Sequence, residues 1–325
     1  MQSFFFSVKL AIGQSGNLQV KKPYFQQRTD YVIQVKLDDK KHELHAYEEI
    51  IYSNNSRVPL DSIYIHLWAN GYKNNETAFA KHMLENGNTD FFYSSEDEKG
   101  YIDSLDFKVE KKKVKWHFHP EHIDICIIKL NEPLLPGNSI KISTPFHVKL
   151  PGDFSRMGHE GESYQITQWY PKPAVFDRDG WHPMPYLNQG EFYSEYGSFN
   201  VSITLPENYV VGATGDLQNA EEREWLLKKV EETAEITSFP RNDSFPKSSE
   251  EFKTLLYTQN KVHDFAWFAD KRFNVLRGEV ELPHTKDTVE TWVMFTNDEA
   301  DLWKGAIPYM NRAIYSYSLW NGDYP

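Results

Sequence analysis

The chain has 325 residues, and its 35 Lys and Arg against 47 Asp and Glu give a net charge of −12. This sign excludes a protein that neutralises nucleic-acid phosphates and disfavours binding to an anionic membrane surface. Aromatic residues make up 15% of the chain, which excludes a disordered polypeptide, and the length predicts more than one domain.

Residues 1–23 form an N-terminal segment in which Lys9 interrupts the apolar run Phe4–Ile12. Two interpretations stay open: the remnant of a secretory signal, or a first strand. The first favours a periplasmic or extracellular protein, and the second leaves a cytoplasmic one open. Nowhere does the sequence reach the roughly 18 uncharged apolar residues of a spanning helix, so no membrane span is predicted.

Alternating apolar and polar residues predict a run of strands between residues 31 and 148. The predicted strands are Tyr31–Leu37, Glu43–Tyr52, Ser62–Leu67, Ile102–Val109, Val114–Phe118, Ile123–Leu130 and Ser139–Val148. Their spacing predicts a mainly β protein with a large antiparallel sheet, not a wound α/β fold. Cys126, the single cysteine, lies in one of these strands, and we expect a buried thiol.

The block 149–197 is rich in Gly, Pro and aromatic residues and is predicted to be loop that packs over one face of the sheet. Four further strands are predicted at Phe199–Leu205, Tyr209–Ala213, Thr254–Gln259 and Val289–Phe295. Helical spacing predicts one helix over Asn219–Glu235 and a longer one from Ala300 to Tyr317. Pro308 should kink or interrupt the longer helix.

No set of metal ligands is predicted from histidine spacing. His159 and Glu160 begin a zinc motif, but Ser163 occupies the place of the second histidine. The cluster His117, His119 and His122 lies in a lysine-rich segment that is typical of an exposed hairpin, and the pair His42 and His45 would lie on opposite strand faces. Nucleophile elbows and phosphate-binding loops are also absent, so no catalytic residue is predicted.

Gln165 and Gln168 lie in the most aromatic part of the sequence. A glutamine amide held among packed aromatic rings can accept a hydrogen bond from a substrate ammonium group. The alternative is an amide that is hydrogen-bonded within the protein and purely structural.

Several motifs resemble the aminopeptidase-N-like zinc metallopeptidases, also called gluzincins. Thr167–Pro171 (TQWYP) followed by Ala174–Asp177 (AVFD) resembles the family's T-Q-F-E-P stretch and the F-P-C-F-D-E-P that follows it. Ile65–Asn70 (IHLWAN) is similar to one of its strands, and Leu130–Gly137 is similar to its L-x-x-P-L-x-x-G turn. Gly322–Pro325 resembles the family's F-G-x-Y-P turn.

The resemblance implies a β-saddle domain over residues 24–260, followed by the beginning of an α+β thermolysin-like catalytic domain over 261–325 that is truncated. In the family the glutamine that matches Gln168 holds the free α-amino group of a peptide, and Tyr170 stands where the family often has an acidic residue. Both are therefore expected to bind substrate. The family's zinc ligands and catalytic residues would follow Pro325, so zinc is expected in the full-length protein and neither metal nor catalysis in this fragment.

The expected function is the N-terminal part of a zinc-dependent, aminopeptidase-like hydrolase that cleaves peptide bonds near a free N-terminus. The expected partners are a peptide substrate and the remainder of the catalytic domain. An alternative of another class is a non-catalytic β-rich module for binding or scaffolding, with the aromatic residues as its contact surface.

Overall fold

A computed structural model describes residues 24–242 and 244–324. The segment 1–23, with both interpretations of the N-terminus, lies outside the described residues, as does Pro325 of the predicted C-terminal turn. Among the described residues no helix is long and apolar enough to cross a membrane.

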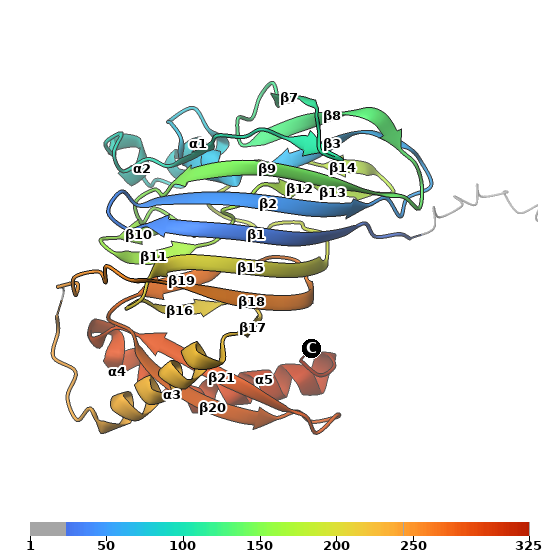
Figure 1. The fold of residues 1–325 in the computed structure, drawn as a ribbon. Coiled ribbons are helices and arrows are strands. Elements are labelled where there is room, and N and C mark those ends of the chain that lie inside the picture. The colour runs from blue at the N-terminus through green and yellow to red at the C-terminus, as the bar shows by residue number, and fades with distance from the viewer. Residues whose placement is uncertain (1–23, 243, 325) are drawn as a thin grey trace, which may run out of the picture.

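A nine-stranded sheet runs through the middle of the molecule (Figure 1). Its strands, in spatial order, are β17 (Asp216–Leu217), β18 (Phe252–Val262), β15 (Gly197–Pro206), β1 (Arg28–Asp38), β2 (Glu43–Ser53), β9 (Ser139–Lys149), β5 (Lys108–Val109) and β6 (Lys112–Lys113), with β4 (Tyr101–Asp103) also paired to β9. All pairs are antiparallel except β1 with β15, which is parallel. The prediction of a mainly β fold with a large sheet is confirmed, and the sheet is mixed at this one pair.

Two smaller sheets share the core of the large one. The first contains β12 (Lys172–Pro173), β3 (Leu60–His66), β8 (Ile125–Leu134) and β7 (Lys115–Phe118); the second contains β10 (Gly158–Glu160), β11 (Ser163–Ile166), β19 (Trp267–Asp270) and β16 (Val210–Ala213). Alternate residues of β1, from Tyr31 to Leu37, are buried, as period-two strands require. They join Ile63 of one small sheet and Ile166 of the other in a continuous apolar core. Cys126 is buried in this core, as predicted.

The block 149–197 packs against the large sheet, as predicted, and also contains short strands. Besides β10, β11 and β12 it forms the hairpin of β13 (Val175–Asp177) and β14 (Gly180–His182). Trp169 and Tyr186 from this block are fully buried. Three short helical elements that were not predicted lie near β3 and β9 (Figure 1). They are the 3₁₀-helix Trp68–Tyr72 and the helices α1 (Ala78–Glu85) and α2 (Asp90–Tyr93).

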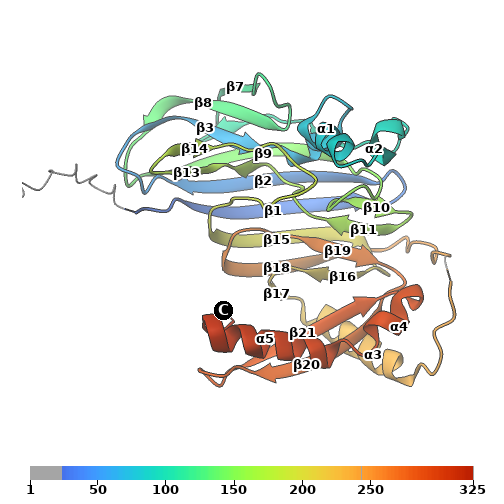
Figure 2. The same ribbon diagram turned by 180° about the vertical axis from the view of Figure 1, so that it is seen from behind.

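A second layer lies below the β17 edge of the large sheet (Figures 1 and 2). The hairpin of β20 (Asn274–Glu281) and β21 (Thr288–Phe295) separates helix α3 (Ala220–Glu235) on one side from α5 (Ile307–Asn321) on the other. Leu226 of α3 packs with Val275 of β20, while Val293 and Phe295 of β21 pack with the start of α5. The predicted interruption near Pro308 is confirmed: a short helix α4 (Ala300–Trp303), preceded by the 3₁₀-turn Asn297–Glu299, ends before α5 begins at Ile307, and Pro308 lies in the first turn of α5.

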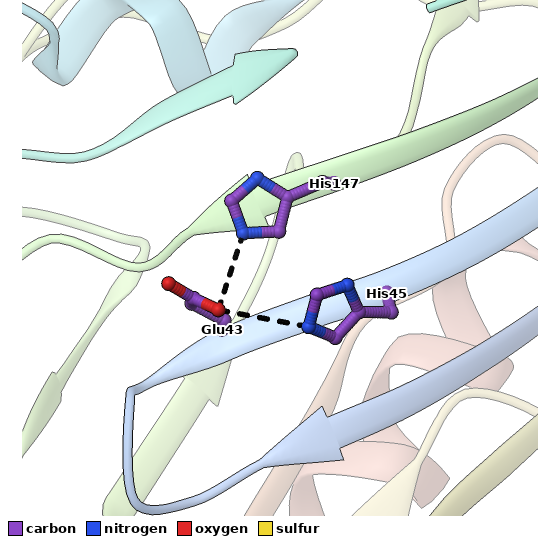
Figure 3. Close-up of side chains that lie close together, drawn as sticks. All are labelled: Glu43, His45 and His147. Carbon is purple, nitrogen blue, oxygen red and sulfur yellow. Dashed lines mark ion pairs between the residues drawn. The ribbon is translucent and has the colours of Figure 1, made fainter. Parts of the chain in front are cut away.

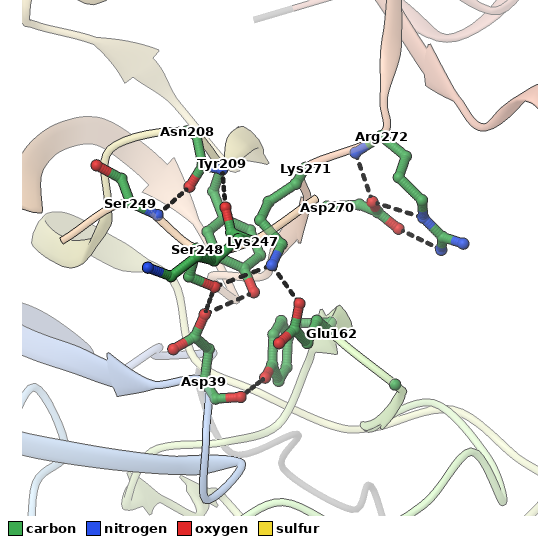
Figure 4. A network of polar contacts seen from close by, with 12 residues as sticks. Asp39, Glu162, Asn208, Tyr209, Lys247, Ser248, Ser249, Asp270, Lys271 and Arg272 are labelled. Atoms are coloured by element: carbon green, nitrogen blue, oxygen red, sulfur yellow. Dashed lines mark hydrogen bonds and ion pairs between the residues drawn. The ribbon is translucent and has the colours of Figure 1, made fainter. Parts of the chain in front are cut away.

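A buried network fastens the segment between α3 and β18 to the large sheet (Figure 4). The Lys271 side chain is fully buried and donates to the Glu162 carboxylate and, at 2.9 Å, to Ser248 Oγ. Ser248 Oγ also donates to Asp39 Oδ2, which accepts a second hydrogen bond from Tyr209 Oη at 3.1 Å. These bonds join residues from distant parts of the chain. Helix α3 precedes residue 260 in the sequence but lies in the second layer, so a domain boundary near residue 260 stays a prediction.

Candidate functional site

Gln168 follows β11 and adopts a left-handed backbone conformation, with φ of 49°. This region is costly for residues other than glycine, so the surrounding structure must hold Gln168 there. Gln168 Nε2 lies 3.5 Å from Asp264 Oδ2, which makes a weak hydrogen bond. Gln168 Oε1 is buried and accepts no hydrogen bond from the described residues. The amide therefore has an unused acceptor beside a carboxylate.

Tyr170 lies two residues on and is only 2% exposed. Its hydroxyl donates to Asp264 Oδ1 at 2.7 Å, and its ring meets Tyr31 and Phe199 edge-on. Burial raises the pKa of Tyr170 well above its usual value, so the hydroxyl stays a neutral donor. The structure thus places Tyr170 in the core, where it orients Asp264.

Lys172 completes the cluster from the other side of Asp264. Its ammonium lies 3.2 Å from Asp264 Oδ2 and donates to the His263 carbonyl at 2.6 Å, and only 2% of the side chain is exposed. Burial lowers the pKa of Lys172, and the Asp264 carboxylate opposes that shift. Lys172 therefore neutralises the Asp264 carboxylate within the interior.

Segment 263–265 holds the loop after β11 in place. Trp169, fully buried, donates from Nε1 to the Phe265 carbonyl at 3.1 Å, and the Phe265 amide donates to Asp264 Oδ1 at 2.8 Å. The Trp169 contact anchors the loop directly after Gln168. We call the set Gln168, Tyr170, Lys172 and Asp264 the Asp264 cluster.

Sequence reasoning named Gln168 and Tyr170, and the structure brings both to one carboxylate. The sequence reasoning did not identify Asp264 or Lys172 as site residues. A lysine between Pro171 and Pro173, inside an apolar aromatic block, was the available signal, because a buried lysine requires a partner. Nothing local in the sequence points to Asp264 as that partner. Substrate binding by Gln168 and Tyr170 stays a prediction.

The histidines considered from the sequence lie apart from this cluster. His42 stacks on His159 at a ring distance of 3.8 Å, and His119 stacks on His122 at 5.3 Å. Neither pair belongs to a group of three ligands among the described residues. The residues that do form such a group are Glu43, His45 and His147.

The Asp264 cluster does not offer a set of zinc ligands. Both Asp264 oxygens already accept hydrogen bonds or an ion pair from Tyr170, Phe265 and Lys172. The buried Lys172 ammonium would also repel a divalent ion. The chemistry that this arrangement supports is recognition of a hydrogen-bond donor by an amide oxygen, not activation of water.

Sequence comparison finds no relative: no protein-family profile matches the chain, and no curated protein matches it. Solved structures do match. A two-domain M1 zinc metallopeptidase variant bound to L-arginine is 14% identical with a TM-score of 0.52, over 92% of this chain and 55% of that one. The M1 zinc metallopeptidase from Deinococcus radiodurans is 15% identical with a TM-score of 0.50, over 92% and 54%.

A third structure is a variant of the Deinococcus radiodurans enzyme bound to a Tyr-Ser-Ala substrate, 14% identical with a TM-score of 0.50, over 92% and 55%. The chain therefore spans about half the length of the structures it matches. At these identities the likeness concerns the fold, and it agrees with the resemblance seen in the motifs. The chain has the fold of the M1 zinc metallopeptidases, the aminopeptidase-like group that its sequence resembles.

Proposed function

We propose that the chain is the β-saddle and adjoining part of an M1-type zinc metallopeptidase, and that Gln168 binds the free α-ammonium group of a peptide. The observation that carries this proposal is the Gln168 amide: its oxygen is unpaired among the described residues, and its backbone is held at φ of 49°. A buried acceptor without a donor costs about 1–3 kcal/mol, and an ammonium donor removes that cost.

Binding requires a small movement, because Gln168 Oε1 is buried. The contact that the side chain would give up is the 3.5 Å hydrogen bond to Asp264, which contributes little. Rotation would bring the amide oxygen to the ammonium while Tyr170 and Lys172 keep Asp264 in place. Tyr170 acts in this proposal through Asp264 rather than by touching the peptide.

In this proposal the zinc ligands and the residues that hydrolyse the peptide bond lie outside these 325 residues. The 325 residues contain no H-E-x-x-H sequence, and the Asp264 cluster does not fit a zinc ion. We propose that peptide hydrolysis uses zinc ligands outside these residues, and that this chain alone is inactive. A periplasmic or extracellular location is part of the proposal and rests on the segment 1–23.

Calorimetry with two tripeptides tests the binding role. One is Tyr-Ser-Ala with a free α-amino group, and the other is the same peptide N-acetylated. The free peptide should bind more tightly, and Gln168→Ala should weaken it by about tenfold, the value of one hydrogen bond to a charged group. Gln165→Ala is the matched control, because Gln165 donates to Asp153 at 2.6 Å and to the Ser155 carbonyl.

The outcomes separate the two candidate functions. Equal binding of both peptides, unaffected by Gln168→Ala, would contradict amine recognition and favour the non-catalytic binding module. Hydrolysis is tested with aminoacyl-arylamides and internally quenched peptides, with and without chelator, on this chain and on the complete gene product. Chelator-sensitive turnover by these 325 residues alone would overturn the assignment of zinc to other residues.

A further inference from the structure

Two histidines and a glutamate meet on one face of the large sheet (Figure 3). Glu43 and His45 are two residues apart on β2 and therefore point to the same face. His147 on β9 is the direct cross-strand partner of His45, and it is diagonal to Glu43, whose partner is Lys149. The antiparallel register thus brings His147 to two ligand side chains that lie about 100 residues earlier in the sequence.

The distances between the ligand atoms suit one metal ion. Glu43 Oε2 lies 3.5 Å from His147 Nε2 and 3.6 Å from His45 Nε2, and all three atoms lie within 4.8 Å of one another. A tetrahedral ion with bonds of 2.0–2.1 Å needs ligand atoms about 3.3 Å apart. Small rotations of the two imidazole rings, which are 5.0 Å apart, bring the three atoms to this spacing.

Asp103 holds the His147 ring in position through a hydrogen bond to its other nitrogen. It is the cross-strand partner of His147 on the other side, and its carboxylate lies 2.9 Å from His147 Nδ1. A proton on Nδ1 donated to Asp103 leaves Nε2 of the same ring unprotonated and aimed at Glu43. Metal-binding histidines commonly have such a carboxylate partner, which fixes the tautomer and raises the basicity of the ligand nitrogen.

The lysine paired with Glu43 across the strands does not occupy the space between the ligand atoms. Lys149, opposite Glu43, extends its ammonium to the Glu96 carbonyl at 3.0 Å. Tyr101 covers one side, with its ring 6.0 Å from that of His147. His147 is largely covered while the His45 side chain is about half exposed, so a fourth position faces solvent.

We propose that Glu43, His45 and His147 bind a first-row divalent transition metal ion such as Zn²⁺, with Asp103 as the positioning residue for His147. Two imidazoles and one carboxylate favour Zn²⁺, Ni²⁺ or Cu²⁺ over Mg²⁺ and Ca²⁺, which prefer oxygen ligands. The site links β2 to β9 and is separate from the Asp264 cluster, so it does not depend on the proposed function. It also departs from the sequence expectation that this chain binds no metal.

Calorimetry at pH 7.5 with ZnCl₂, and with MgCl₂ as the comparison, tests the site. We expect one Zn²⁺ per chain, no binding of Mg²⁺ in the same concentration range, and a rise in the melting temperature with Zn²⁺. His147→Ala should abolish stoichiometric binding, and Asp103→Asn should weaken it by 10- to 100-fold. At pH 5.5 binding should weaken, because protons compete for the imidazole nitrogens.

The control is the double variant His119→Ala/His122→Ala, which removes the partly exposed stacked pair and should bind Zn²⁺ as the wild type does. Co²⁺ substitution gives a second readout, a visible absorption band that His147→Ala removes. Circular dichroism shows whether the variants are folded. Binding that survives His147→Ala, or that disappears in the double variant, would overturn the proposal, as would the absence of binding to the folded wild type.

Discussion

The Lys172 ammonium and the Asp264 carboxylate lie 3.2 Å apart and connect two segments that are more than 90 residues apart in sequence. The lysine is buried and the aspartate is about one-fifth exposed. The pair is thus asymmetric, because loss of the carboxylate leaves a buried cation, whereas loss of the lysine leaves an anion that keeps other donors.

Asp264→Asn should therefore destabilise the protein by about 3–5 kcal/mol, the cost of breaking one side of a buried ion pair. Lys172→Met should cost less, because Tyr170 and the Phe265 amide still donate to Asp264. Urea unfolding followed by tryptophan fluorescence measures both. Asp301→Asn, which breaks an exposed surface pair with Lys304, is the control and should have little effect. Equal losses for Asp264→Asn and Asp301→Asn would contradict the argument.

Gln168→Gly should raise the free energy of unfolding by about 1 kcal/mol, because glycine adopts a positive φ without the steric cost that other residues bear. The substitution also removes the unpaired amide oxygen. A stabilised variant that no longer distinguishes the free from the acetylated peptide would show that the chain retains Gln168 for binding. A loss of stability would instead favour the structural amide that the sequence left open.

The stability of the protein should depend on Glu195 between pH 4.5 and 7. Burial, with a contribution from the Asp177 carboxylate, raises the pKa of Glu195 from 4.5 to about 7 despite hydrogen bonds from Gln26, Gln27 and Phe176. As the pH rises through this window the unfolded chain loses the proton while the folded protein keeps it. The free energy of unfolding should fall by roughly 3 kcal/mol from this group and then level off.

Glu195→Gln removes that dependence. Urea unfolding of the wild type and the variant at pH 4.5, 6 and 8 gives the difference, in which other titrating groups cancel. We expect the free energy of unfolding of the variant to increase relative to that of the wild type as the pH rises. Parallel profiles for the two proteins would show that folding does not raise the pKa of Glu195.

Helix α5 presents an exposed aromatic surface, with Tyr309, Tyr317 and Trp320 exposed by 70%, 66% and 73%. Patches of this kind mark contact surfaces or promote association. The protein should bind a fluorescent hydrophobic dye and self-associate in light scattering, and Tyr317→Glu/Trp320→Glu should reduce both. Tyr93→Glu, at an exposed tyrosine on α2, is the control. A monomeric protein that does not increase the fluorescence of the dye would contradict this expectation.

The strands could be predicted because their signal is local. Period-two alternation places the strands β1, β2 and β9 within three residues of their observed ends, since one face of each is buried. Strand β20 was missed: its sequence NVLRGEVE contains Gly278 and several charged residues, and its strand character depends on pairing with β21 and on packing between α3 and α5. The helices α1 and α2 span only eight and four residues, which is too short for a helical period to be recognised in the sequence.

The two clusters could not be predicted because they depend on register. His45 was compared with His42, its neighbour in sequence, and was placed on the opposite face. Its actual partner is His147, which only the pairing of β2 with β9 brings opposite. Asp264 likewise reaches Gln168 through a loop contact 96 residues away in sequence. Motifs therefore located Gln168 and Tyr170, but not the charges that surround them.

The parallel pair of β1 and β15 has a consequence for how the polypeptide is made. Asp30 in β1 accepts a hydrogen bond from the Ser198 amide, 168 residues later, so one edge of β1 has no partner until most of the chain has left the ribosome. Until then the hairpin of β1 and β2 exposes unpaired backbone groups and a row of apolar side chains. Folding should accordingly be slow, and a nascent chain stalled before β15 should be a chaperone client.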